Sequence, residues 1–541
     1  MHHSRDGIRP CSRDPRIETD VAAIKQKLDQ VSTYLRSSIP IPQLLHDASI
    51  SPGQDETTFT QLENSPFQLL MSEQIMVIFG LDGSFPRELL KVERSTVPTL
   101  PHNAPKLRVI QHHHIAEALA SFAVHIYPWY PILPVGFTEW YHSTLSGALP
   151  PGPQSSLALV VVALGLWAQQ EQQHGACGAD RSLCEQYLVE ALSSLPIVTA
   201  DSSLESVQFL LYLAVYYCCC SKPCQAYEYA AMASIKVQNL VRSRGQDTEE
   251  RQEQTRKAYW AILLLESEIQ IQFDLVETGI WHHEEKVPLP NGRLAWSYDF
   301  SNDASPASIA DSVRSAIAQQ TEDKTQSYFL AEIAMRRMLH RCNSATRRNA
   351  QGDIVYASGI ALELESQLEE WYNCLPQALK FHREQPPSPD FFTTQVSDPT
   401  TTFLRVQYYC CKISIYWPAI YTCMQDSAQA AVLLDDCRKF FNSYLHLAPS
   451  ILSSVQECFV NRWTLFGSIF MTTMAAVQAT SAADPQCCTP LEWSRLLEAL
   501  ESMRTVQGNV INASPSLLLL AETLSSYLDT CRGEWDLRPS V

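Results

Sequence analysis

The sequence predicts an all-α protein, and three observations support this prediction. Glycine, which tight β-hairpins need, occurs only 18 times in 541 residues, below its usual share of about 7%. Apolar residues recur at helical spacing, so that Trp260, Leu263, Leu264 and Ile271 share one helix face. No alternating apolar–polar pattern is long enough to indicate a sheet. We therefore expect a large multi-helix domain, preceded by a linker and a short N-terminal amphipathic or coiled-coil helix.

The first expected element is an amphipathic helix over residues 17–35. Its apolar residues follow one another at alternating spacings of four and three, as in a coiled-coil seam. The stripe consists of Ile17, Val21, Ile24, Leu28, Val31 and Leu35. Because it is shorter than three heptads, pairing through it alone would be marginal. Two interpretations stay open: a homodimer formed through this helix, or a helix that packs on its own domain. We assign residues 1–36 to the N-terminal tail and this helix.

Residues 37–106 are expected to form a largely irregular linker. The first part, residues 37–66, is rich in Ser, Pro, Gln and Asp, and a proline-broken stretch runs from Ser84 to Pro105. The helical body then covers residues 107–541, where apolar segments of helical spacing alternate with proline-rich breaks.

The charge balance argues against a broad nucleic-acid-binding face. The formal net charge is −18, whereas proteins that grip DNA neutralise its phosphates with Lys and Arg. Basic pairs such as Arg336-Arg337 are spread among acidic residues, so we expect them to lie on solvated faces or in structural ion pairs.

The chain shows no sign of membrane insertion or of secretion. Its longest apolar run, residues 157–167, is shorter than the ~20 residues that cross a bilayer. Residues 1–20 have no apolar core of a signal peptide. The 17 cysteines are then expected to be reduced thiols in a cytosolic or nuclear protein.

Clusters of cysteine and histidine do not have the spacing of metal sites. Cys218, Cys219 and Cys220 are consecutive, and consecutive residues on a helix point in different directions and cannot converge on one ion. We interpret them as small buried apolar residues. The same argument applies to residues 112–114, and His282-His283 lies in a turn without a third ligand in register. We predict no metal ligand and no cofactor in this chain.

The sequence also contains no common catalytic motif. A Walker loop, a Rossmann glycine fingerprint, a nucleophile elbow and a metalloprotease helix pair are all absent from it. We therefore predict that the chain is not an enzyme and has no catalytic residue.

One segment near the middle of the chain combines a basic pair, two aromatic residues and an apolar helical run. It begins at Arg256, passes through Trp260 and reaches an acidic residue at Glu266. About twenty residues after Glu266, Pro288 and Pro290 belong to an apolar Pro-Leu-Pro segment. Four other segments accompany it: residues 122–133, 328–339, 367–376 and 404–418.

In their order and content these five segments resemble the fungal-specific transcription factor domain, the regulatory middle region of fungal zinc-cluster activators. Two departures are Glu266-Ser267 where the family has Asp-Arg, and Trp417-Pro418 where Arg-Pro is common. The residues that carry the resemblance are Trp129, Pro131, Arg256, Trp260, Glu266, Pro288, Pro290, Trp371, Pro376, Arg405, Tyr409 and Pro418.

The resemblance implies an all-helical regulatory domain of a fungal transcription factor, with no catalytic residue. It implies control of a metabolic or biosynthetic set of RNA polymerase II genes from the nucleus. Expected partners are the transcription machinery or co-regulators, and a small-molecule effector is a candidate ligand. The alternative function is a helical adaptor that regulates through partner binding without touching DNA.

The zinc-cluster head of the family is not found in this sequence. Family members usually begin with six cysteines that hold two zinc ions, opening as C-x2-C-x6-C, whereas Cys11 is isolated here. We therefore expect zinc binding and direct DNA contact only through a head that this sequence lacks. Two explanations stay open: the transcript starts downstream of an exon for the head, or the protein is a headless relative that acts through partners.

Overall fold

The structure is a computed structural model of the chain. It describes residues 65–95, 112–146, 150–174, 182–243, 248–273, 275–292, 295–298, 311–344, 347–348, 354–355, 358–383, 398–425, 431–482, 490–505 and 514–535. The stripe from Ile17 to Leu35 lies outside these described residues, so the coiled-coil helix stays a prediction.

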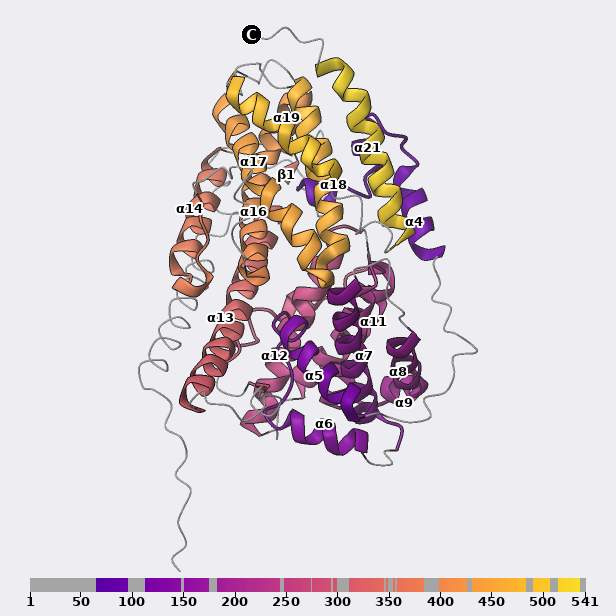
Figure 1. The fold of residues 1–541 in the computed structure, drawn as a ribbon. Helices are drawn as coiled ribbons and strands as arrows, with labels where there is room; N and C mark the ends of the chain where they lie inside the picture. The colour runs from indigo at the N-terminus through magenta and orange to yellow at the C-terminus, as the bar shows by residue number, and fades with distance from the viewer. Residues whose placement is uncertain are drawn as a thin grey trace, which may run out of the picture.

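The described helices form two neighbouring groups that are joined by the long helix α13 (Asp311–Ser344) (Figure 1). The N-terminal group consists of α5 (His112–His125), α6 (Phe137–Ser146), α7 (Pro153–His174), α8 (Ser182–Ser193), α9 (Leu195–Ala200), α10 (Leu204–Cys219), α11 (Pro223–Arg242) and α12 (Glu249–Gln270), with the 3-10 turn η2 (Ile280–His283). The C-terminal group consists of α14 (Ser358–Cys374), α16 (Pro399–Gln425), α17 (Leu434–Glu457), α18 (Arg462–Ala482), α19 (Pro490–Thr505) and α21 (Pro515–Trp535), with the 3-10 turns η4 (Gln377–Leu379) and η6 (Phe459–Asn461). One continuous cluster of buried apolar side chains runs through both groups.

The all-α prediction is confirmed for the part of the chain that the structure describes. The strands found there are β1 (Arg347–Arg348) and β2 (Ile354–Val355), which form one short antiparallel hairpin. None of the described helices is both long and apolar enough to cross a membrane.

Capping residues explain where two central helices begin. The Ser203 hydroxyl accepts a hydrogen bond from the Ser206 N–H at 3.2 Å at the start of α10, and Thr248 Oγ1 accepts from the Arg251 N–H at 3.3 Å at the start of α12. These bonds satisfy backbone donors that have no partner inside the helix. α10 is apolar around its whole circumference and is buried on all sides, as expected for a helix at the centre of a bundle.

Residues 65–95 differ from the expected irregular linker. They form η1 (Pro66–Gln68), α3 (Glu73–Ile78) and α4 (Phe85–Ser95), and α4 lies beside α21 (Figure 1). Phe67 and Leu89 are buried, and the ring of Phe85 stacks on Phe470 of α18 at 5.6 Å between centroids. Burial of these apolar side chains against the C-terminal group stabilises helices that the local Ser- and Pro-rich composition does not predict.

Glu93 holds α4 in place through a buried hydrogen bond. Its carboxylate accepts from the Ser516 hydroxyl at 2.5 Å, and Trp463 Nε1 donates to the same Ser516 oxygen at 2.9 Å. Burial raises the pKa of Glu93 from 4.5 to about 7, against the opposing effects of Ser516, Cys224 and Lys222. The folded protein therefore binds a proton at Glu93 over a pH range in which the unfolded chain has released it.

We expect Glu93→Gln to stabilise the protein at pH 8 and to have little effect at pH 4. A raised carboxyl pKa means that stability falls as the pH rises from 4.5 to about 7, and the full cost above pH 7 is about 3 kcal/mol. Gln has the same shape and carries no charge, so it removes this cost. Denaturant unfolding of both proteins at the two pH values measures the difference. Glu88→Gln, at an exposed position of α4, is the control; equal gains for both variants, or a gain that does not depend on pH, would contradict the expectation.

Candidate functional site

Helix α13 is the element around which three of the family-motif tryptophans gather. Trp129 packs edge-on against Tyr328, with 5.6 Å between ring centroids. Trp371 Nε1 donates a hydrogen bond to the Ala331 carbonyl at 3.3 Å, and the guanidinium of Arg337 lies 5.7 Å from the centre of the Trp260 ring. Segments that are far apart in the sequence therefore meet on one stretch of α13.

The central motif segment is held together by local bonds. Trp260 Nε1 donates a hydrogen bond to the Pro288 carbonyl at 3.0 Å. This bond joins α12 to the Pro-Leu-Pro segment that begins at Pro288. Glu266 is buried and its carboxylate oxygens accept from Thr278 Oγ1 at 2.6 and 2.9 Å. Arg256 pairs with Glu253 at 3.1 Å, and Pro290 is buried while Pro288 is exposed. These contacts indicate structural roles.

The remaining motif residues make structural contacts or are buried. Arg405 donates to the His446 carbonyl at 2.8 Å and lies over the ring of Tyr409, 4.9 Å from its centre. Pro418 is buried inside α16, and Pro376 precedes the turn η4. Pro131 is buried next to the Trp129 turn. Pro131 therefore adjoins the tryptophans on α13, whereas Arg405 and Tyr409 contact each other and His446 of α17.

Charged and polar side chains from four elements meet next to these tryptophans, where the two helix groups join. We call this set the polar junction. It consists of Glu268 of α12, Gln272 just after α12, Glu332 and Arg336 of α13, Gln407 of α16, and Thr464 and Ser468 of α18.

Arg336 is the centre of the polar junction. Its guanidinium pairs with Glu268 and lies 3.4 Å from a Glu332 oxygen, with only 4% of the Arg336 side chain exposed. Gln407 Nε2 donates to Glu332 Oε1 at 2.7 Å, and Thr464 Oγ1 donates to Glu268 Oε1 at 2.7 Å. These bonds connect the N-terminal group, α13 and the C-terminal group through a single arginine.

Burial and charge act in opposite directions on the ionisable groups of the polar junction. Burial raises the pKa of Glu332, although Arg336 and Gln407 act to lower it. Burial acts to lower the pKa of Arg336, but Glu268 and Glu332 outweigh this effect, so that it lies above its usual value. The arginine is therefore held in its charged form between two carboxylates.

Several atoms of the polar junction have no hydrogen-bond partner among the described residues. They are Glu332 Oε2, Arg336 Nε, Gln407 Oε1 and Gln272 Oε1. Buried polar groups in folded proteins nearly always have a partner, which is either protein, water or a ligand. The partners of these atoms would therefore be ordered water or another group outside the described residues.

A second buried ion pair connects the two helix groups. Arg462 of α18 pairs with Glu171 of α7 at 2.8 Å, and their side chains are 4% and 5% exposed. Removing one partner of such a pair is costly, whereas replacing both by apolar residues is often neutral. Buried charge at this boundary therefore favours one defined arrangement of the groups.

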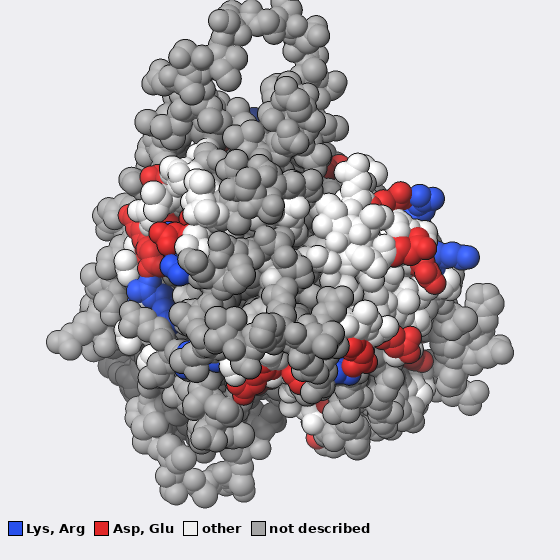
Figure 2. Space-filling view, turned by 90° about the horizontal axis from the view of Figure 1, so that it is seen from above, with Lys and Arg blue, Asp and Glu red and all other residues white. Residues whose placement is uncertain are grey.

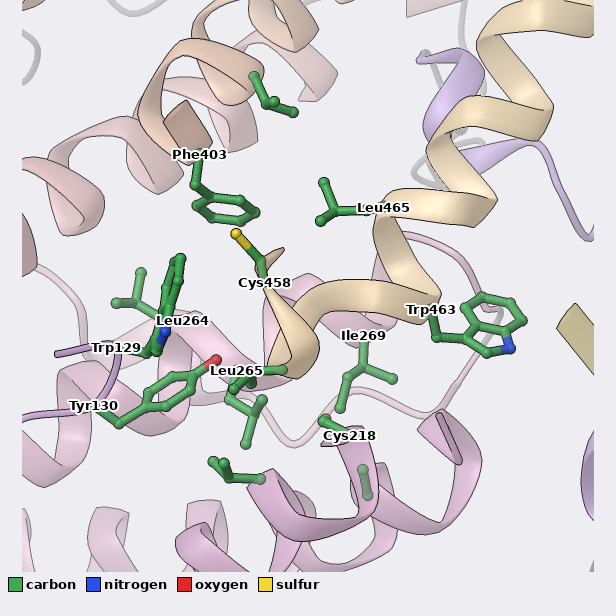
Figure 3. Close-up of a cluster of buried hydrophobic side chains, with 14 of the residues drawn as sticks. Trp129, Tyr130, Cys218, Leu264, Leu265, Ile269, Phe403, Cys458, Trp463 and Leu465 are labelled. Carbon is green, nitrogen blue, oxygen red and sulfur yellow. The ribbon is translucent and has the colours of Figure 1, made fainter. Parts of the chain in front are cut away.

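The cysteines of residues 218–220 lie at the end of α10, where most of their surface is packed against apolar neighbours. Cys218 and Cys219 are buried, and Cys218 belongs to the apolar cluster in Figure 3. Burial raises the pKa of both thiols far above the usual value. Among the residues that the structure describes, no group of three or more His, Cys, Asp or Glu side chains could hold a metal ion.

The polar junction was not predicted from the sequence. Arg336 was expected on a solvated face or in a structural ion pair, and it lies in an ion pair that is buried. A signal was present in Glu332 and Arg336, which are four residues apart on an otherwise apolar helical segment. Their partner Glu268 on α12 could not be recognised without the fold.

Comparisons with known proteins give the family. Residues 119–373 match the model of the fungal specific transcription factor domain. A protein of Aspergillus rugulosus named "Putative transcription factor ecdB" is 38% identical over 533 residues, which cover 95% of this chain and 90% of that protein. The chain belongs to the family of fungal-specific transcription factors. No solved structure matches the chain.

Family membership confirms the predicted role of the chain as a fungal transcription regulator. The matched range includes Trp129, Trp260 and Trp371 and the α12 and α13 residues of the polar junction, whereas Gln407 and Thr464 lie beyond it. In this regulator, the polar junction therefore connects the matched domain to the C-terminal helices.

Proposed function

We propose that this helical body is the regulatory part of a nuclear fungal transcription factor that controls a metabolic or biosynthetic gene set without catalysis. The polar junction carries the proposal. Apolar contacts are non-directional, whereas a buried arginine between two carboxylates favours one arrangement of the elements that supply them. A partner or effector that favours another arrangement would have to change these contacts, and so would shift the population of regulatory states.

Direct DNA contact would come from a separate zinc-cluster head and not from this helical body. The net charge of −18 opposes binding to phosphates. On the described part of the face shown in Figure 2, acidic and basic side chains lie interspersed in small groups. A zinc-cluster head would supply both the zinc ions and the DNA contacts, while the helical body would meet the transcription machinery or co-regulators.

Recruitment to a promoter tests this function. We expect the chain, fused to an unrelated DNA-binding module, to change transcription of a reporter that carries the module's site, relative to the module alone. The unfused chain should bind duplex DNA weakly and without sequence preference in a mobility-shift titration at physiological salt, because its charge is acidic. An unchanged reporter would favour the helical adaptor, and tight, sequence-selective binding by the unfused chain would contradict the assignment of DNA contact to a separate head.

We also propose a homodimer through the stripe from Ile17 to Leu35. Replacing Ile24 and Leu28 by Asp should abolish the dimer without unfolding the body, because charges in an apolar seam cannot be buried. Analytical ultracentrifugation measures the association, and circular dichroism follows the fold. Gln26→Asp with Gln30→Asp, two positions outside the stripe, is the matched control. A monomeric wild type, or a dimer that persists in the Ile24/Leu28 variant, would show that the helix packs on its own domain.

A further inference from the structure

We propose that Cys423 and Cys437 are a reversible oxidation site, at which hydrogen peroxide converts two neighbouring thiols to a disulfide that joins α16 to α17. This inference goes beyond the proposed function and does not depend on it. Three observations support it: the two sulfur atoms are in contact, the helices that carry them are fixed against each other, and both cysteines lie close to helix ends.

The two thiols lie within reach of a covalent bond. The sulfur atoms of Cys423 and Cys437 are 3.7 Å apart, although the residues are separated by 14 positions in the chain. Both residues are buried, at 2% and 0% exposure. A disulfide bond is about 2 Å long, so the sulfur atoms need to approach by less than about 2 Å. Small rotations of the two side chains, together with a small shift of one helix, supply this approach.

Contacts elsewhere between α16 and α17 hold the two cysteines opposite each other. The helices lie side by side (Figure 1). The ring of Trp417 packs against Phe440 with 6.3 Å between centroids, and Lys439 Nζ lies 5.0 Å from the centre of the Tyr416 ring. These contacts set the antiparallel register in which the thiols meet. Two groups held in contact react as an intramolecular pair, at a far higher effective concentration than separate thiols have.

The position of the pair at helix ends gives an oxidant access to it. Cys423 lies close to the C-terminal end of α16, and Cys437 lies close to the N-terminal end of α17. Just before α17, Ala431 and Val432 are exposed, and Val432 is 77% exposed. Helix ends open at a small cost in free energy compared with the unfolding of a whole domain. Hydrogen peroxide, which is a small molecule, can therefore reach these thiols while the rest of the helical body stays folded.

The oxidation takes place in two steps that balance. The thiolate of one cysteine attacks an oxygen of hydrogen peroxide, the O–O bond breaks, and a sulfenic acid and one water molecule form. The second thiol attacks the sulfenic sulfur, the S–O bond breaks, and the oxygen leaves as a second water molecule while the S–S bond forms. The two thiols lose two electrons in total, and one peroxide molecule accepts them. A cellular thiol such as glutathione reverses the oxidation by thiol–disulfide exchange.

The disulfide would make the C-terminal helix group more resistant to opening. It would connect α17 to α16, the helix that supplies Gln407 to the polar junction. A covalent link between the two helices also restricts the unfolded chain, which is the main way in which disulfides stabilise proteins. We therefore expect the oxidised protein to melt at a higher temperature than the reduced protein.

Mass spectrometry of the purified full chain tests the proposal directly. The chain is treated with hydrogen peroxide, unfolded in the presence of iodoacetamide and digested with trypsin. Cleavage after Lys412 and Arg438 releases residues 413–438 as one peptide, whose two cysteines are Cys423 and Cys437. We expect this peptide to lose two hydrogen atoms and to carry no iodoacetamide label, and dithiothreitol added before labelling should restore both labels. Two labels after peroxide treatment, or cysteines that gain oxygen without forming the disulfide, would overturn the proposal.

Thermal unfolding of two variants connects the disulfide to stability. Peroxide should raise the melting temperature of the wild type, and dithiothreitol should reverse the rise. Cys423→Ser should abolish the rise, whereas Cys531→Ser, at a half-buried cysteine of α21, should leave it unchanged. A rise that persists in Cys423→Ser, or a disulfide without any rise in the wild type, would contradict a stabilising link between these helices. The wild-type peptide decides the proposal even if Cys423→Ser does not fold. Because neither measurement uses DNA or a reporter, the outcome is separate from that of the fusion experiment.

Discussion

Replacing Arg336 by Met is expected to lower the free energy of unfolding by about 3–5 kcal/mol. The substitution would leave Glu268 and Glu332 buried without their shared cation, at a place where their side chains are 14% and 6% exposed. Glu268 would still accept from Thr464, but neither carboxylate would have a compensating charge from Arg336. Urea denaturation of the wild type and the variant, followed by circular dichroism, measures the difference.

Two further variants separate the loss of charge pairing from the loss of packing. Combining Arg336→Met with Glu268→Gln and Glu332→Gln removes all three charges, and we expect it to recover part of the lost stability, because the remaining groups are neutral. Arg438→Met removes an arginine that is 49% exposed and pairs with Asp435, and surface pairs of this kind contribute only about 0–1 kcal/mol. If Arg336→Met were no more harmful than Arg438→Met, the polar junction would not determine the stability of the fold.

The second large effect is expected for Trp260→Ala, which should lower the free energy of unfolding by about 3–5 kcal/mol, the range for large aromatic truncations in cores. The structure confirms that Trp260 is buried, with 0% of it exposed. The truncation would leave a cavity between α12 and α13 and would remove the donor to the Pro288 carbonyl. Thermal and urea unfolding of the two proteins give the magnitude.

Trp281→Ala serves as the control for this truncation. Trp281 is half-buried and its ring stacks on His340 at 4.3 Å between centroids. Because less of its surface is removed from water, we expect a smaller loss, of about 1–2 kcal/mol. Unfolding curves of Trp260→Ala that coincide with those of the wild type would show that Trp260 contributes little to the core.

Much of the helical body could be predicted from the sequence because helices are local. The spacing of Trp260, Leu263, Leu264 and Ile271 places them on one helix face, and the first three are buried while Ile271 is half-buried. Tyr259, Ile262 and Leu265 on the other sides of α12 are buried as well, because helices surround it, and the spacing alone does not predict that. The interpretation of Cys218 and Cys219 as buried apolar residues was possible from local geometry, since consecutive residues diverge on any helix. The motif order likewise indicated the family without knowledge of the fold.

Residues 65–95 show where local reasoning fails. Their Ser- and Pro-rich surroundings indicate a linker, yet Phe85 packs on Phe470 and Glu93 binds Ser516, at separations of several hundred residues. Composition reports the preference of a segment in isolation. Whether the segment is ordered depends on an apolar surface elsewhere in the chain, and no local pattern reveals that surface.

The sequence by itself determined that this protein is helical, where its apolar helical segments lie and to which family it belongs. Only the tertiary structure decided that Arg336 is buried, that it pairs with Glu268 as well as with Glu332, and that Gln407 and Thr464 complete the polar junction. The physical reason lies in the range of the interactions. Helix formation and amphipathicity depend on neighbours within about four residues, whereas the burial of a charge depends on partners that the packing of distant helices brings together.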